Sequence, residues 1–168
     1  YEKNDEGLTI RNITPVNRES ILKDYYWPHH EKLHQAVEQQ LTENGKATIV
    51  DCHSFPDKPF KRDLNQNQDR PDFNIGTDTF HTPKKLIKLS KNFFNEKGFS
   101  VGLDWPYSGT IVPLTHYKKN KNVQSIMLEV NRSLYLNENA NSQSKQYLKT
   151  KAIIQEYLKL LQENCNLL

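Results

Sequence analysis

The chain has 168 residues, which is enough for one domain with its own hydrophobic core. Its 23 basic and 20 acidic side chains nearly balance, and the excess positive charge forms no stripe interleaved with aromatic residues, so we expect no nucleic-acid partner. No apolar run reaches the length of a membrane span, and we expect no membrane partner. Only two cysteines are present, Cys52 and Cys165, which favours a reducing compartment and a cytoplasmic location.

The amino-terminal part is predicted to be irregular over residues 1–16, with at most a short strand near residues 8–13. A helical region begins at Asn17, a good N-cap residue, and Pro28 should kink or restart it. From there an apolar helical face runs to a stop at Asn44 and Gly45. The residues of that face are Leu33, Ala36, Val37 and Leu41.

A β-branched apolar run then ends abruptly in polar groups, which predicts a buried strand over residues 47–53. Strand side chains alternate, so Asp51 and His53 share one face. Ligands of open α/β sheets collect at the carboxyl ends of strands. His53 is therefore a candidate metal ligand with Asp51 behind it, or a general base. A histidine that merely makes hydrogen bonds as the strand leaves the core is the structural alternative.

The rest of the chain alternates long loops, at 54–71 and 104–122, with regular elements. These elements are a short extended segment at 72–76 and a helix at 82–97, which is opened by Thr82 and Pro83. Two core strands follow at 99–103 and 123–130, and a last helix at 144–163. The order of helices and strands predicts a three-layer α/β/α sandwich with a mostly parallel or mixed sheet.

Two charged residues near these strands are candidates for chemistry. Arg70 precedes a proline, and Gly76 further on allows a close backbone approach. Such an arginine can grip a substrate carboxylate in two-pronged fashion, although a surface-loop arginine would look the same. Glu129 interrupts an apolar strand, where an unpaired carboxylate is costly to bury. It is a candidate general base, the alternative being an ion pair with Arg132.

His30 and His34 form a literal H-E-x-x-H, in which two histidines one helical turn apart can chelate zinc. The sequence around them does not continue as in the known zincins. Val37 stands where a metzincin needs glycine, and a strand follows instead of the second helix of a gluzincin. A zincin-type metalloprotease remains a less favoured alternative to an amphipathic helix flanked by histidines.

Four blocks, in order and at the right spacing, resemble the N-formylglutamate amidohydrolase family. They are DCHSFP at 51–56, RPDFNIGT at 70–77 with FHTP at 80–83, YSGTIVP at 107–113, and EVNRSLY at 129–135. The family belongs with the zinc carboxypeptidase-like hydrolases, of phosphorylase/hydrolase-like fold. Its members use zinc to hydrolyse an N-acyl amide bond, typically releasing formate and glutamate.

The resemblance implies a role for each matching residue. His53 corresponds to a zinc ligand, with Asp51 behind it, and Glu129 to the general base and acid. Polar positions around a small N-acyl amino acid substrate correspond to Arg70, Asn74, Thr110 and Arg132.

The sequence departs from the family in two places. The family's first metal block, of Pro-His-Ser-Gly type with a downstream carboxylate, has no equivalent here, so we expect the remaining zinc ligands upstream of Tyr1 and a single domain, 1–168, incomplete at its amino terminus. Near Pro113 the histidine-pathway members usually carry an arginine, which is missing. We expect a zinc-dependent N-acyl amino acid hydrolase, the alternative being a non-catalytic binding domain on the same fold.

Overall fold

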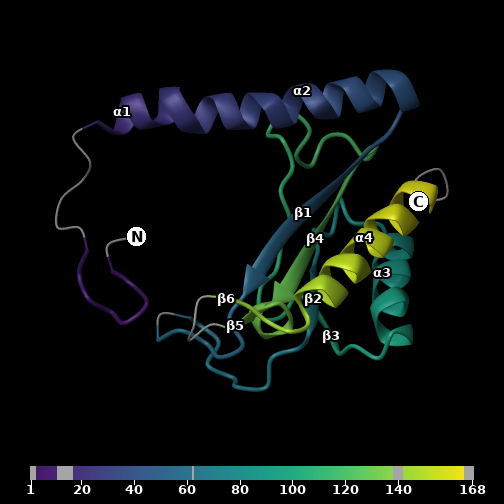
Figure 1. Cartoon of the computed structure of the whole chain (residues 1–168). Helices are drawn as coiled ribbons and strands as arrows, with labels where there is room; N and C mark the ends of the chain where they lie inside the picture. The colour runs from purple at the N-terminus through teal and green to yellow at the C-terminus, as the bar shows by residue number, and fades with distance from the viewer. Residues whose placement is uncertain (1–2, 11–16, 62, 138–141, 165–168) are drawn as a thin grey trace.

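A computed structural model of the chain describes residues 3–10, 17–61, 63–137 and 142–164 (Figure 1). The helices of the fold are α1 (Arg18–Ile21), α2 (Trp27–Asn44), α3 (Lys84–Glu96) and α4 (Tyr147–Asn164). The strands are β1 (Ala47–Phe55), β2 (Phe73–Gly76), β3 (Val101–Leu103), β4 (Val123–Asn131), β5 (Leu136–Asn137) and β6 (Ser142–Gln143).

The main sheet has the strand order β1-β4-β2-β3. Strands β1 and β4 are parallel, β2 and β3 are parallel, and β2 runs antiparallel to β4. The sheet is therefore mixed, as the sequence predicted. All nine residues of β4 are buried, which explains why this strand reads as an almost continuous apolar run.

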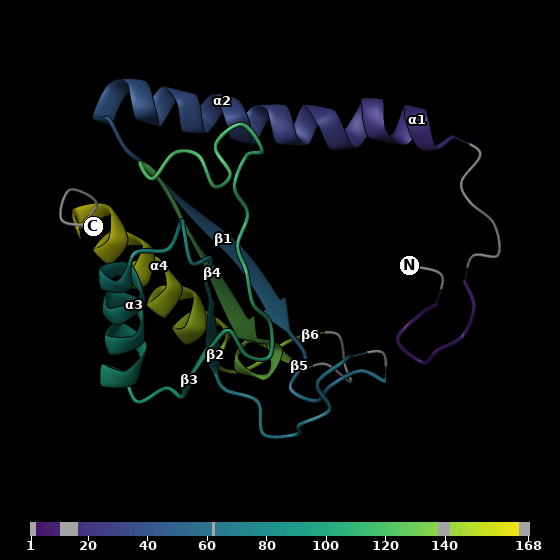
Figure 2. The ribbon, with the colours of Figure 1, turned by 180° about the vertical axis from the view of Figure 1, so that it is seen from behind.

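Three layers are formed by the sheet and by helices on both of its faces. Helices α3 and α4 lie side by side against one face (Figures 1 and 2), where Leu128 of β4 joins Phe94 and Tyr157 in the main core. Helix α2 crosses the other face near the start of β1 and β4, and its Val37 packs against Ala47 and Val123. This arrangement confirms the predicted α/β/α sandwich.

The first helical region is a single long rod rather than two kinked pieces. Between α1 and α2 the chain forms a π-helical turn (Leu22–Tyr26), and Pro28 lies in the first turn of α2. Proline lacks the N–H that would bond one turn back, and the wider π turn accommodates that gap without a break. Gly45, with φ of 69°, ends α2 at the predicted position.

Several boundaries differ from the sequence expectations: β1 continues to Phe55 rather than ending at residue 53, and β3 begins at Val101 rather than at residue 99. The last helix begins at Tyr147 rather than at residue 144, because Ser142 and Gln143 pair with Leu136 and Asn137 in a short hairpin. The strand expected near residues 8–13 falls partly outside the described residues, and its described part contributes one bridge, between Lys3 and Thr9. Among the described helices, none is long and apolar enough to cross a membrane.

Candidate active site

Three neighbouring strands bring predicted site residues together on one face of the sheet. Glu129 of β4 is paired in register with His53 of β1 on one side and with Asn74 of β2 on the other. Their chain neighbours Leu128 and Ile75 belong to the core under α3 and α4. Because strand side chains alternate, His53, Asn74 and Glu129 project from the opposite face, which we call the Glu129 face.

Asp51 and His53 form a close pair at the edge of this face. His53 Nε2 lies 2.8 Å from Asp51 Oδ1, as the two-residue strand spacing predicted. About half of the His53 side chain is exposed. The contact fixes the ring orientation and leaves Nδ1 without a hydrogen bond to any described residue, an arrangement typical of a metal-ligating imidazole with a carboxylate behind it.

Glu129 is a buried carboxylate with only 6% of its surface exposed. Its Oε2 atom has no hydrogen-bond partner among the described residues. Burial raises the pKa of Glu129, the positive charges of His53 and Arg132 lower it, and the negative charge of Asp51 raises it further, so that the pKa lies above its ordinary value. Arg132 donates from Nε to Ser54 Oγ at 3.4 Å rather than to Glu129.

A loop that follows β3 covers part of the Glu129 face. Trp105 N–H donates to Asn74 Oδ1 at 3.0 Å, and Asn74 Nδ2 donates to the carbonyl of Tyr107 at 2.8 Å. Further along, the Thr110 hydroxyl lies 2.6 Å from the Ser125 hydroxyl of β4. Both polar atoms of the Asn74 amide are thus engaged in holding residues 104–113, which we call the covering loop.

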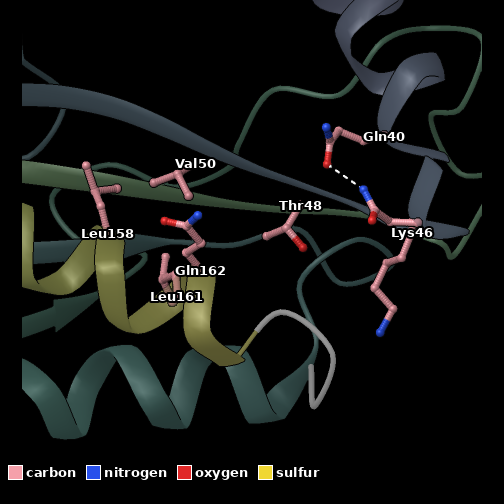
Figure 3. A pocket seen from close by; sticks show the side chains of 8 residues that line it. Gln40, Lys46, Thr48, Val50, Leu158, Leu161 and Gln162 are labelled. Atoms are coloured by element: carbon pink, nitrogen blue, oxygen red, sulfur yellow. Dashed lines mark hydrogen bonds between the residues drawn. The ribbon is translucent and has the colours of Figure 1, made fainter. Parts of the chain in front are cut away.

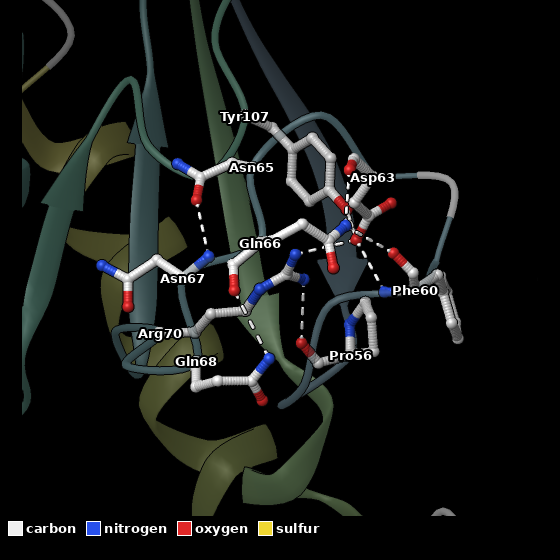
Figure 4. A network of polar contacts seen from close by, with 9 residues as sticks. All are labelled: Pro56, Phe60, Asp63, Asn65, Gln66, Asn67, Gln68, Arg70 and Tyr107. Atoms are coloured by element: carbon white, nitrogen blue, oxygen red, sulfur yellow. Dashed lines mark hydrogen bonds and ion pairs between the residues drawn. The ribbon is translucent and has the colours of Figure 1, made fainter.

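Arg70 lies in a buried polar network between two loops (Figure 4). Its Nη2 atom is 2.8 Å from Asp63 Oδ2, and Nη1 donates to the carbonyl of Pro56 at 3.1 Å. The Tyr107 hydroxyl donates to the same Asp63 oxygen at 3.3 Å. Only 1% of the Arg70 side chain is exposed, and Nε is its buried nitrogen without a partner. The sequence did not single out Asp63, because no spacing rule connects two polar residues within a long loop.

The described residues contain one group of metal-ligating side chains that meet, and it includes neither His53 nor Glu129. His34 and Glu38 of α2 approach His116, with ligand atoms all within 4.8 Å of one another. His30, the other histidine of the H-E-x-x-H, instead contacts the Tyr26 ring, at 4.1 Å between centroids. Among the described residues, neither His53 nor Glu129 belongs to such a group, and a zinc site needs three or four protein ligands.

Two surface grooves lie on the α4 side of the sheet. One, of about 560 Å³, is enclosed by the end of α2, β1 and α4 and contains none of the predicted site residues (Figure 3). The other, of about 600 Å³, runs between β1 and α4, and its lining includes Cys52, Ser54 and Thr150 together with the predicted site residue His53. Burial and the charge of Asp51 raise the pKa of Cys52, which disfavours a thiolate nucleophile there.

The mixed sheet with helices on both faces, and with the buried Glu129 near the carboxyl end of its inner strand β4, has an α/β hydrolase-like fold. The family model described as N-formylglutamate amidohydrolase matches residues 2–136. The chain therefore belongs to the N-formylglutamate amidohydrolase family, as its four sequence blocks predicted.

Two solved structures have the same fold. One is an N-formylglutamate amidohydrolase from Ralstonia eutropha JMP134, with a TM-score of 0.75 at 22% identity, covering 94% of this chain and 61% of that one. The other is a gene product from Agrobacterium tumefaciens, with a TM-score of 0.61 at 13% identity, covering 97% of this chain and 60% of that one. The chain thus spans about three fifths of either relative. No curated protein matches it.

Proposed function

We propose that the protein is a zinc-dependent hydrolase of the amide bond of an N-acyl amino acid, with N-formylglutamate as the first substrate to test. The observation that carries this proposal is the buried, unpartnered carboxylate oxygen of Glu129 in register with His53. Family membership supports amide hydrolysis as the reaction class. In this proposal a water molecule attacks the acyl carbon, and the amine of the amino acid leaves.

Glu129 acts in this reaction as the general base and then as the general acid. Burial raises its pKa, which makes the carboxylate a better proton acceptor than an exposed glutamate. It takes a proton from the attacking water and delivers that proton to the leaving nitrogen. When bound, zinc would polarise the acyl carbonyl and lower the pKa of a coordinated water.

His53 fits the role of one zinc ligand, since Asp51 fixes its ring and leaves Nδ1 available. The described residues place no group of three metal ligands around His53, so the proposal assigns His53 alone among the zinc ligands. Both solved relatives are longer than this chain, which is consistent with additional site residues.

Arg132 is a substrate-binding candidate because its positive charge lies close enough to act on Glu129. It follows β4, three residues after that carboxylate. Thr110 lies in the covering loop above Ser125 and can meet a substrate from that side. For Arg70 and Asn74 we propose that substrate contact is indirect, because the bonds of both residues hold the loops around the face.

The proposal is tested by following the release of the free amine of glutamate from N-formylglutamate and from N-acetylglutamate, using the complete natural protein loaded with zinc. We expect hydrolysis of an N-acyl compound that is lost in Glu129→Gln. A non-catalytic binding domain is the second candidate, since no group of three metal ligands among the described residues includes His53. Saturable binding of N-formylglutamate without any hydrolysis by the zinc-treated protein would favour it.

A further inference from the structure

A second cluster of metal-ligating groups joins α2 to the segment that leads into β4. His34 and Glu38 lie one turn apart on α2, and His116 reaches them from the segment between Pro113 and Asn120. Glu38 Oε1 is 2.7 Å from His116 Nε2 and 4.0 Å from His34 Nδ1. The imidazole rings of His34 and His116 lie 5.7 Å apart between centroids.

The position of His116 points to a ligand. This residue is 9% exposed, and its Nε2 atom is buried without a hydrogen bond, even though the Glu38 carboxylate is only 2.7 Å away. The distance is short, but the direction is not that of a hydrogen bond. A buried nitrogen costs free energy when it has no partner. His116 Nε2 and the Glu38 carboxylate therefore need either a poorly aligned hydrogen bond or a cation that both of them bind.

The spacing of the three groups suits a tetrahedral cation. Zinc bound to nitrogen and oxygen at about 2.0–2.2 Å separates neighbouring ligand atoms by roughly 3.3 Å. The separations from Glu38 Oε1 to the two ring nitrogens lie on either side of that value. Two imidazoles and a carboxylate are also a ligand set that zinc accepts, with water in the fourth position. About half of the Glu38 side chain is exposed, so water can reach the site.

We propose that His34, Glu38 and His116 bind a divalent cation of the zinc class, at a site that shares no residue with the His53 and Glu129 pair. The ion would join α2 to the segment after the covering loop, and on binding it would replace the 3.2 Å contact between Thr115 Oγ1 and His34 Nδ1. The same stretch of chain carries Thr110 over the sheet. The role of this site is to hold the covering loop in place, and it supplies no group to the reaction.

Zinc titration of the metal-free protein by calorimetry tests this site. Because loss of a group that only supports a ligand costs about 10–100-fold in metal affinity, loss of a direct ligand should weaken binding by at least about 100-fold. We expect that loss in both His34→Gln and His116→Gln. Zinc should raise the Tm of the wild type by more than it raises the Tm of either variant, because the variants lack this site.

The matched controls are His30→Gln, one turn away on the same helix, and His53→Gln on the Glu129 face. Both should keep this zinc site. Because His116 is buried, Glu38→Gln serves as the exposed variant that preserves packing, and it should also weaken binding. The proposal would be overturned if the folded wild type bound no zinc. It would also be overturned if His53→Gln lost zinc while His34→Gln and His116→Gln kept it. A third contradicting result is loss of zinc in His30→Gln and His34→Gln with normal binding in His116→Gln.

Discussion

Glu129 and His53 are direct partners in the parallel register of β4 and β1, and both side chains emerge on the face opposite α3 and α4. The pairing places a buried carboxylate beside a half-exposed imidazole whose other side is held by Asp51. A proton acceptor and a candidate metal ligand therefore meet at the carboxyl end of two adjacent strands, where ligands of open α/β sheets bind.

Glu129→Gln is expected to lower kcat and leave substrate affinity largely unchanged in the complete natural protein. The glutamine side chain is nearly the same shape, so the fold should survive, but it cannot accept a proton. A positioned general base contributes about 10²–10⁴ in rate. The measurement is kcat and KM for formate release, together with zinc content and Tm.

The control for this substitution is Glu43→Gln, at an exposed glutamate on α2. It should leave kcat, KM, zinc content and Tm at their wild-type values. If Glu129 is only structural, the Glu129→Gln protein would melt at a lower temperature and turn over normally. A folded, zinc-loaded variant with near-normal kcat would remove Glu129 from the mechanism.

The buried ion pair between Arg70 and Asp63 is expected to stabilise the two loops that frame the Glu129 face. Removing one partner of such a pair leaves an uncompensated charge and typically costs about 3–5 kcal/mol. Arg70→Ala and Asp63→Ala should each lower the free energy of unfolding strongly, because the Arg70 side chain is 1% exposed and that of Asp63 10%.

A double-mutant cycle in urea measures the coupling between them. We expect the double variant to be much less destabilised than the sum of the single variants, since it leaves neither charge alone. Additive losses would show that the two side chains act independently.

Tyr157 is expected to make stability fall in alkaline solution. Burial raises its pKa to about 12, while the Ser90 hydroxyl, 2.8 Å from the phenol, partly opposes the shift. The folded state therefore holds the phenolic proton more tightly than the unfolded chain, whose tyrosine titrates near 10. This contribution is fully present below pH 10 and is lost as the pH rises through the folded pKa.

A shift of that size corresponds to a loss on the order of 3 kcal/mol across this window. Tyr157→Phe removes the titrating group. The free energy of unfolding, followed by urea titration at increasing pH, should decline more steeply for the wild type than for this variant. Parallel curves would show that Tyr157 titrates normally.

The strands of the site were predictable because their patterns are local. The apolar runs before His53 and around Glu129 predict buried strands, and alternation then orients both side chains without knowledge of the fold. The pairing of Arg70 with Asp63 was not predictable, because it depends on the path of an irregular loop. His34 was noticed only with His30, whereas its neighbour in space is His116, 82 residues further along the chain.

The two-residue strands β5 and β6 were missed for a different reason. Each has two residues, which is too short to show an alternating pattern. The substrate roles of Arg70, Asn74, Thr110 and Arg132 remain predictions, since they depend on the resemblance to the family.

The last prediction concerns Gly76, where β2 passes beneath the covering loop. A Cβ atom built on Gly76 would lie 2.5 Å from the Gly109 carbonyl oxygen and 2.3 Å from the Met127 side chain. The methionine end can move, but the carbonyl belongs to the loop backbone, so Gly76→Ala must push the covering loop away from the Glu129 face. Overpacking of this kind costs about 1–3 kcal/mol.

Gly98→Ala is the control, because Gly98 has φ of 83° with open space around it and lies at the end of α3. Both variants should melt at a lower temperature, Gly98→Ala because an alanine is strained at positive φ. Only Gly76→Ala should also raise KM for the N-acyl substrate, since only there does the added methyl group displace the loop that carries Thr110. Equal KM values in the two variants would show that the position of the covering loop does not matter to substrate binding.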